Sequence, residues 1–171
     1  MNRLILRVSV FFVFMALYTA SYYIGTFGDV SNDESLAFVE EFGELLESID
    51  TFGIFANNTI LSLPMFIPGV GVVWGLFSGW STGYAFASIA ATTPALSDFP
   101  PLAILYSSTF GFVELVAYSI GTSRGYLLIW SIIKRKKLSV DIIPVSIEIA
   151  AVIALLYVGA ILEFDLIKDF L

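Results

Sequence analysis

Glu114 is a carboxylate within the apolar sequence STFGFVELVAYSIGTSRG, and its type and setting make it the first residue to consider for chemistry. A carboxylate inside a hydrophobic helix is costly unless it is protonated, paired or hydrated. Such a group marks either an ion or proton site or the centre of a buried hydrogen-bond network, and the sequence leaves both open. We expect its nearest partners to be amides and hydroxyls, such as those of Asn57, Asn58, Thr59 and Ser62.

Two further charged residues, Arg124 and Glu148, also occur in apolar surroundings. Arg124 lies about 15 Å from Glu114 along a straight helix, which is too far for a direct pair. Arg124 could instead reach Glu148 from a neighbouring helix. The predicted intramembrane polar site consists of Glu114, Asn57, Asn58, Arg124 and Glu148.

The amino-acid inventory excludes most familiar catalysis. Cysteine and histidine are both absent, so the chain has no disulfide, no thiolate or imidazole metal site, and no Ser-His or Cys-His nucleophile pair. The remaining carboxylates show no paired spacing of the kind that acid and base catalysis uses. We therefore expect no enzyme, no metal site and no cofactor, and one short basic run gives no support for nucleic-acid binding.

The elements that position these residues are expected to be membrane helices. The chain is 58% hydrophobic, has a mean hydropathy of +0.90 and is 13% charged, whereas a soluble domain is about 25% charged. The stretch 51–97 carries no charge at all, and one span needs about 20 residues. We predict an all-α polytopic membrane helix bundle forming a single domain over residues 1–171. The about five predicted spans are 5–27, 52–67, 70–92, 101–121 and 141–163.

The segment 29–50 holds eight of the fifteen acidic residues and no basic one, so it cannot span a membrane. Ser31 and Glu34 have the spacing of a capping box, and apolar residues follow at helical intervals. We predict an acidic amphipathic extracytoplasmic helix at about 31–50. It is either a solvated helix that covers the bundle or a docking surface for a partner or a cation.

Breaks and basic residues set the expected topology. Prolines and glycines within 64–71 and the sequence GTSRG at 121–125 predict interruptions of the helices, and such interruptions can line a transport site. Arg3, Arg7 and the run 134–137 fall on one side of a five-span chain, which predicts a cytoplasmic N-terminus and an extracytoplasmic C-terminus. The first span alternatively resembles a cleaved signal sequence.

A row of small residues runs along the third predicted span at intervals of four. Small residues let helix backbones approach closely in a bilayer, where apolar side chains gain little by meeting. Steps of four residues overshoot a helical turn by about 40°, so the row should face one neighbour early and another late. Packing within one chain and association with a second copy both remain open. The predicted packing glycines are Gly71, Gly75, Gly79, Gly83, Gly121 and Gly125.

The segments FANNTILSLP, PGVGVVWGLFSGWSTG and TFGFVELVAYSIGTSRG together resemble the stage II sporulation protein M family. The resemblance covers residues 52 to about 160 and implies a membrane protein with five spans. Many members carry histidine and glycine ahead of the glutamate of the fourth span, where this chain has Phe110 and Gly111. The bacterial namesake resembles a scaffold that holds cell-wall hydrolases at a septal membrane. The resemblance assigns the family's asparagine, glycines and glutamate to Asn58, Gly71, Gly75, Gly83, Glu114, Gly121 and Gly125.

These observations lead us to expect a non-enzymatic integral protein of the cell membrane that acts as a scaffold or assembly factor. Its expected partners are the lipid bilayer and other membrane or extracytoplasmic proteins, with a second copy of the chain as a further candidate. The alternative is an ion- or proton-coupled transporter or channel that uses Glu114.

Overall fold

The computed structural model describes residues 3–93, 96 and 99–170, and every regular element in that part of the chain is a helix. The predicted all-α class is therefore confirmed. The elements are α1 (Arg3–Gly25), α2 (Asn32–Ser48), α3 (Thr51–Ser62), the 3-10 helix η1 (Leu63–Phe66), α4 (Val70–Thr92), α6 (Pro101–Ser107), α7 (Thr109–Ile133), the 3-10 helix η2 (Leu138–Val140) and α8 (Ile142–Phe170).

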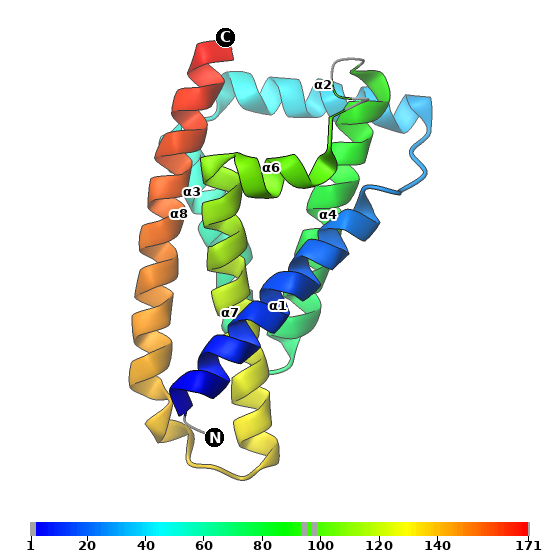
Figure 1. Cartoon of the computed structure of the whole chain (residues 1–171). Coiled ribbons are helices and arrows are strands. Elements are labelled where there is room, and N and C mark those ends of the chain that lie inside the picture. Colours follow the sequence, from blue (N-terminus) through cyan, green and yellow to red (C-terminus); the bar gives the residue numbers. More distant parts are fainter. Residues whose placement is uncertain (1–2, 94–95, 97–98, 171) are drawn as a thin grey trace.

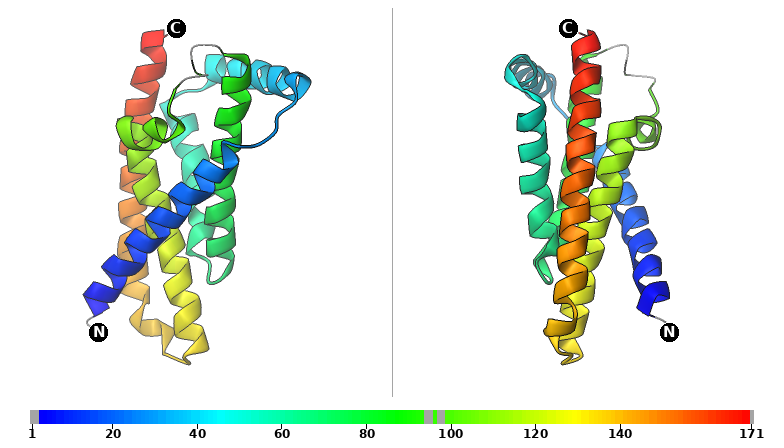
Figure 2. Two further views of the ribbon diagram at one scale, coloured as in Figure 1. Left: turned by 45° about the vertical axis from the view of Figure 1, so that its right-hand side comes forward. Right: turned by 90° about the vertical axis from the view of Figure 1, so that its left-hand side faces the viewer.

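The helices fall into two orientations (Figure 1). Helices α1, α3, α4, α7 and α8 run between the two ends of the molecule, with α1 strongly tilted, whereas α2 and α6 lie across the end that holds the C-terminus. The start of α1 and the connection between α7 and α8 lie at the opposite end (Figure 2). Helix α4 packs on α1, α2, α7 and η1, so it occupies a central place in the bundle.

The number of spans that length and composition support is smaller than predicted. In the described part of the chain, α1 and the 142–168 portion of α8 are long and apolar enough to cross a membrane, and α6 with α7 qualifies as a third only if this bent pair counts as one span. Helix α3 has 12 residues, or about 18 Å, which is shorter than a hydrocarbon core of about 30 Å. Helix α4 has 23 residues, several of them glycine or serine, and is not among the helices apolar enough to qualify.

The segment predicted as a span at 101–121 is not one continuous helix, because the chain turns by 83° between α6 and α7. Ser108 stands at the turn, where its hydroxyl donates to the carbonyl of Ile104 and accepts from the backbone N–H of Gly111 at 3.1 Å. One side chain thus serves the end of α6 and the N-cap of α7. Helix α7 then continues without interruption through the predicted break at 121–125.

The other predicted spans agree with helices but differ in their limits. The span expected at 52–67 is α3 followed by η1, and the one expected at 141–163 is the first part of the longer α8. The predicted break between the second and third spans is present. Gly69 lies there with φ of 81°, a left-handed conformation open to glycine, and α4 begins at the next residue.

The predicted capping box at the start of α2 is confirmed. The backbone N–H of Glu34 donates to the Ser31 hydroxyl at 3.3 Å, and the N–H of Ser31 donates to the Glu34 carboxylate at 3.1 Å. The buried hydroxyl of Ser35 donates to the carbonyl of Ser88, which attaches α2 to α4. Helix α3 begins at Thr51, soon after the end of α2, and the Asp50 side chain caps its N-terminus by accepting from the backbone N–H of Gly53.

The glycine row of α4 faces different neighbours along its length. Gly71 lies against the backbone of η1 and Gly75 against α7, whereas Gly79 and Gly83 lie against the backbone of α1. A Cβ atom added at Gly79 would stand 3.1 Å from a carbonyl oxygen of α1. Contacts within one chain therefore occupy this row, and close backbone approach accounts for its small residues.

Candidate functional site

Two arginines from different helices meet one carboxylate near the end of the bundle where α1 begins. Arg124 of α7 places Nε 2.6 Å from Oε2 of Glu148 and Nη2 2.5 Å from Oε1. Arg7 of α1 donates from Nε to the same Oε1 atom at 2.6 Å. Glu148 thereby joins α1, α7 and α8, and these three residues are called the charged cluster below.

The charged cluster is largely closed to solvent and its geometry is fixed. Arg124 is only 7% exposed, and its two parallel bonds to Glu148 have the forked geometry that holds a carboxylate in one orientation. Arg7 spends its other donors on the Ser123 hydroxyl at 2.7 Å and on the Ile120 carbonyl at 3.3 Å. With two cations and one anion, the cluster carries an excess of positive charge.

Glu114 belongs to a second polar group, near the other end of α7. The side-chain amide of Asn58 in α3 donates to Oε1 of Glu114 at 2.5 Å. Asn57 in turn donates to the amide oxygen of Asn58 at 3.2 Å. This chain from amide to amide to carboxylate ties α3 to α7 and satisfies one oxygen of Glu114.

The five predicted site residues therefore do not form one site. Glu114 and Arg124 lie on the same unbroken helix, about 15 Å apart along its axis. Asn57 and Asn58 lie with Glu114, whereas Glu148 lies with Arg124. The structure thus separates an amide–carboxylate pair from the charged cluster, because α7 does not bend between them.

Glu163 of α8 is a residue of the polar group around Glu114 that sequence reasoning missed. Its Oε2 atom is buried and makes no hydrogen bond within the described residues, and its helix α8 packs along α7, which carries Glu114. Glu163 stands close to the predicted end of the last span, so its position in the sequence suggested only a boundary residue. The one available signal was its apolar surroundings, AILEF.

The sequence indicated only that Arg7 marks the cytoplasmic side, yet Arg7 belongs to the charged cluster. It lies 141 positions from Glu148 in the chain, and no local pattern connects residues so far apart. The sequence did contain one indication. Arg7 follows Arg3 by about one helical turn and stands at the start of the apolar run. An arginine at that depth needs a partner if it is not to reach water.

Two glycines bring α7 against η1 and the start of α4, beside the charged cluster. A Cβ atom added at Gly121 would lie 3.0 Å from Cβ of Met65, and one added at Gly125 would overlap the carbonyl oxygen of Met65. Met65 is fully buried in η1, so α7 and the turn before α4 are in backbone contact beside Arg124. The close approach expected of Gly121 and Gly125 as packing glycines is present, whereas the break also predicted at 121–125 is absent.

Comparison of the chain with family models, with curated proteins and with solved structures gives no match. Within the described residues, no group of three or more acidic side chains is placed to hold a metal ion.

Proposed function

We propose that this chain is a non-enzymatic scaffold of the cell membrane, with α2 as its docking surface for a partner protein that presents basic residues. The observation that carries the proposal is the placement of α2. This helix lies across one end of the bundle, outside the group of helices that run between the ends (Figure 1).

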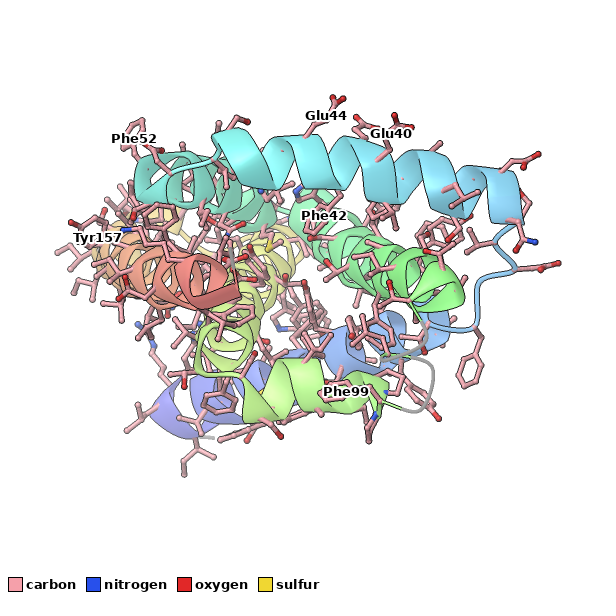
Figure 3. The ribbon with its side chains drawn as sticks, turned by 90° about the horizontal axis from the view of Figure 1, so that it is seen from above. Glu40, Phe42, Glu44, Phe52, Phe99 and Tyr157 are labelled. Carbon is pink, nitrogen blue, oxygen red and sulfur yellow. The ribbon has the colours of Figure 1, made fainter. Side chains whose placement is uncertain are left out.

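Helix α2 presents charge outward and leaves apolar surface uncovered. Glu40 and Glu44 point away from the body of the molecule, whereas Phe42 lies on the side nearer α4 (Figure 3). Leu36 is 58% exposed and Leu45 is 49% exposed. These leucines are nine residues apart and lie on opposite sides of the helix, so they are separate apolar side chains among carboxylates, and the acidic edge favours a basic partner.

The charge on α2 is maintained at physiological pH. Hydrogen bonds from the side chain and then the backbone of Ser31 hold the pKa of Glu34 below its usual value. The segment 29–50 contains no basic residue that could neutralise these carboxylates locally. A partner with lysines or arginines therefore meets an uncompensated negative surface.

The interior of the bundle supports a static role. Glu148 binds Arg7 and Arg124 at once, and this arrangement holds three helices together. A buried ion pair of this kind is costly to open, because either partner left alone keeps an unpaired charge. Rigid helices suit a protein that holds partners in position.

The proposed topology has five crossings, a cytoplasmic N-terminus and an extracytoplasmic C-terminus. Support comes from charge: the start of α1 and the basic connection 134–137 lie at one end of the molecule, and acidic α2 lies at the other (Figure 2). The peripheral helices α1 and α8 are the most apolar. The less apolar α4 is sheltered by α1 and α7, so it needs less lipid-compatible surface.

The resemblance to the stage II sporulation protein M family agrees with this proposal, because it too implies a five-span protein that holds partners at a membrane. It rests on the segments around Asn58, Gly75 and Glu114. The acidic helix α2 lies outside those segments. The docking role is therefore argued from α2 itself.

Site-specific crosslinking in native membranes tests the proposal. A photo-reactive amino acid replaces Glu44 on α2, and the matched control replaces Tyr106 on α6, which lies across the same end and is 47% exposed. The scaffold predicts a discrete protein adduct from position 44 that is absent at position 106. Identical adducts from both positions, or none from position 44, would refute a docking surface on α2.

The Asn58–Glu114 pair favours one alternative, a proton- or cation-coupled transporter. Glu163 adds a second carboxylate with a buried, unpaired oxygen, and paired acidic groups between helices are a common basis of proton transfer. Glu114→Gln retains an oxygen that accepts from Asn58, so the protein should stay folded. A transporter would then lose proton uptake in liposomes, whereas a scaffold would keep its crosslinked partners. Glu114→Leu is the control for lost structure, since it leaves the Asn58 amide unpaired.

A further inference from the structure

A cavity of about 680 Å³ opens next to the charged cluster, between α1, α7 and the start of α8. This volume lies within the range of about 300–1,000 Å³ that is usual for small-molecule sites. The cavity lies at the end of the molecule where α1 begins and where the basic connection joins α7 to α8 (Figure 1). No part of the proposed scaffold role uses it.

The charge of the lining is strongly unbalanced. Two acidic residues, Asp141 and Glu148, face five basic ones. Glu148 already binds two of the arginines, so the remaining positive charge of the cavity is concentrated on its rim, where Lys136 and Lys137 are exposed. The basic lining residues are Arg3, Arg7, Arg124, Lys136 and Lys137.

The opposite part of the lining is apolar and faces outward. Ile143 is 71% exposed and Ile147 is 63% exposed, on the first turns of α8. Trp130 of α7, 41% exposed, also lines the cavity, and tryptophan is enriched where a membrane meets water. The cavity therefore offers basic groups for an anion and, beside them, an apolar wall for hydrocarbon.

We propose that this cavity binds one anionic phospholipid, with its phosphate against Lys136 and Lys137 and its acyl chains along Ile143 and Ile147. Basic pockets between membrane helices near the cytoplasmic surface recognise lipid headgroups by this combination. A soluble phosphate would satisfy only the basic rim and would leave the isoleucine wall unused. The inference does not depend on the scaffold role, since a lipid in this cavity would also be compatible with a transporter.

The test is native mass spectrometry of the detergent-solubilised full chain during titration with dioleoyl phosphatidylglycerol. The first variant is the double substitution Lys136→Gln and Lys137→Gln. Its matched control is Lys134→Gln with Arg135→Gln, which removes two positive charges from the same connection at positions that do not line the cavity. The comparison ligands are dioleoyl phosphatidylcholine, which is zwitterionic, and glycerol 3-phosphate, which lacks acyl chains.

The proposal predicts one tightly bound phosphatidylglycerol per chain and weaker binding of phosphatidylcholine. Since each basic residue near an anionic headgroup contributes about 1 kcal/mol, the variant at 136 and 137 should bind about 30-fold more weakly. The control at 134 and 135 should bind like the parent. Equal weakening in both variants would show general charge attraction, and equal affinity for the two lipids would show no headgroup recognition. Either result overturns the proposal, as does glycerol 3-phosphate displacing the lipid at equal concentration.

Discussion

A single methyl group at Gly83 tests whether α1 and α4 touch through their backbones. A Cβ atom there would overlap the carbonyl oxygen of Tyr22 and lie 3.2 Å from Cα of Gly25. Both are backbone atoms, so α1 itself must move, and the cost should reach the upper end of the overpacking range, about 3 kcal/mol. Because alanine favours the helix more than glycine does, the substitution also adds about 1 kcal/mol to the free energy of unfolding. Gly83→Ala should therefore lower the free energy of unfolding by about 2 kcal/mol, which corresponds to a fall in Tm of roughly 4–8 °C.

Gly159→Ala is the matched control for this prediction. Gly159 is also a buried glycine inside a helix, but a Cβ atom there would stand 3.5 Å from Cγ1 of Val113, an ordinary contact. This variant should melt at or above the parent temperature, since it gains helix propensity without a clash. Tryptophan fluorescence can report thermal unfolding in detergent. Thiol-reactive dyes cannot, because the chain contains no cysteine. If Gly83→Ala melts as high as Gly159→Ala, the close packing of α1 on α4 is refuted.

Three more predictions concern the charged cluster, the topology and α2. Arg124→Met and Glu148→Leu should each destabilise the protein by about 3–5 kcal/mol, and the double variant should cost about 1–3 kcal/mol less than their sum in the same melting assay; full additivity would contradict the ion pair. Single cysteines at Glu44 and Lys136 should react with an impermeant thiol reagent from opposite sides of the membrane, and labelling of both on intact cells would contradict the five-crossing topology. Because the pKa of Glu34 is lowered in the folded state, its contribution to α2 is present at neutral pH and is lost as pH falls below its usual 4.5. Titration by NMR should show this low pKa, and alanine in place of the capping-box serine should raise it; an unchanged pKa would contradict the cap.

The class of fold was predictable because composition and hydropathy act over whole segments. The cap at Glu34 was predictable as well, since it depends on residues three apart. The turn at Ser108 was not, because its surroundings contain no glycine or proline between 102 and 110 and a serine inside an apolar run suits a helix equally well. Only the packing of α6 across the end of the bundle selects the bent form.

The charged cluster shows a different limit. The contact between Arg124 and Glu148 was predictable, because two opposite charges in apolar helices must find partners. The participation of Arg7 depends on the tilt of α1 across α7, which no pattern within α1 reveals. The sequence predicted both close packing at Gly121 and Gly125 and a break at 121–125, because the same residues permit either a bend or a close approach, and the structure has the close approach alone.

The helices that run between the two ends differ greatly in reach, which matters for the membrane around them. Helix α8 has 29 residues, or about 44 Å, whereas α3 with η1 covers only about 26 Å. The turn between η1 and α4 stops short of the connection between α7 and α8 (Figure 2), and next to it the Trp74 indole of α4 donates to the Leu61 carbonyl of α3 at 2.9 Å. A bilayer adjusts to a short hydrophobic element by local thinning, at a fraction of a kcal/mol per ångström. The bilayer is therefore expected to be thinner beside α3 than beside α8. The protein should then favour membranes, or regions of a membrane, with a thinner hydrocarbon core.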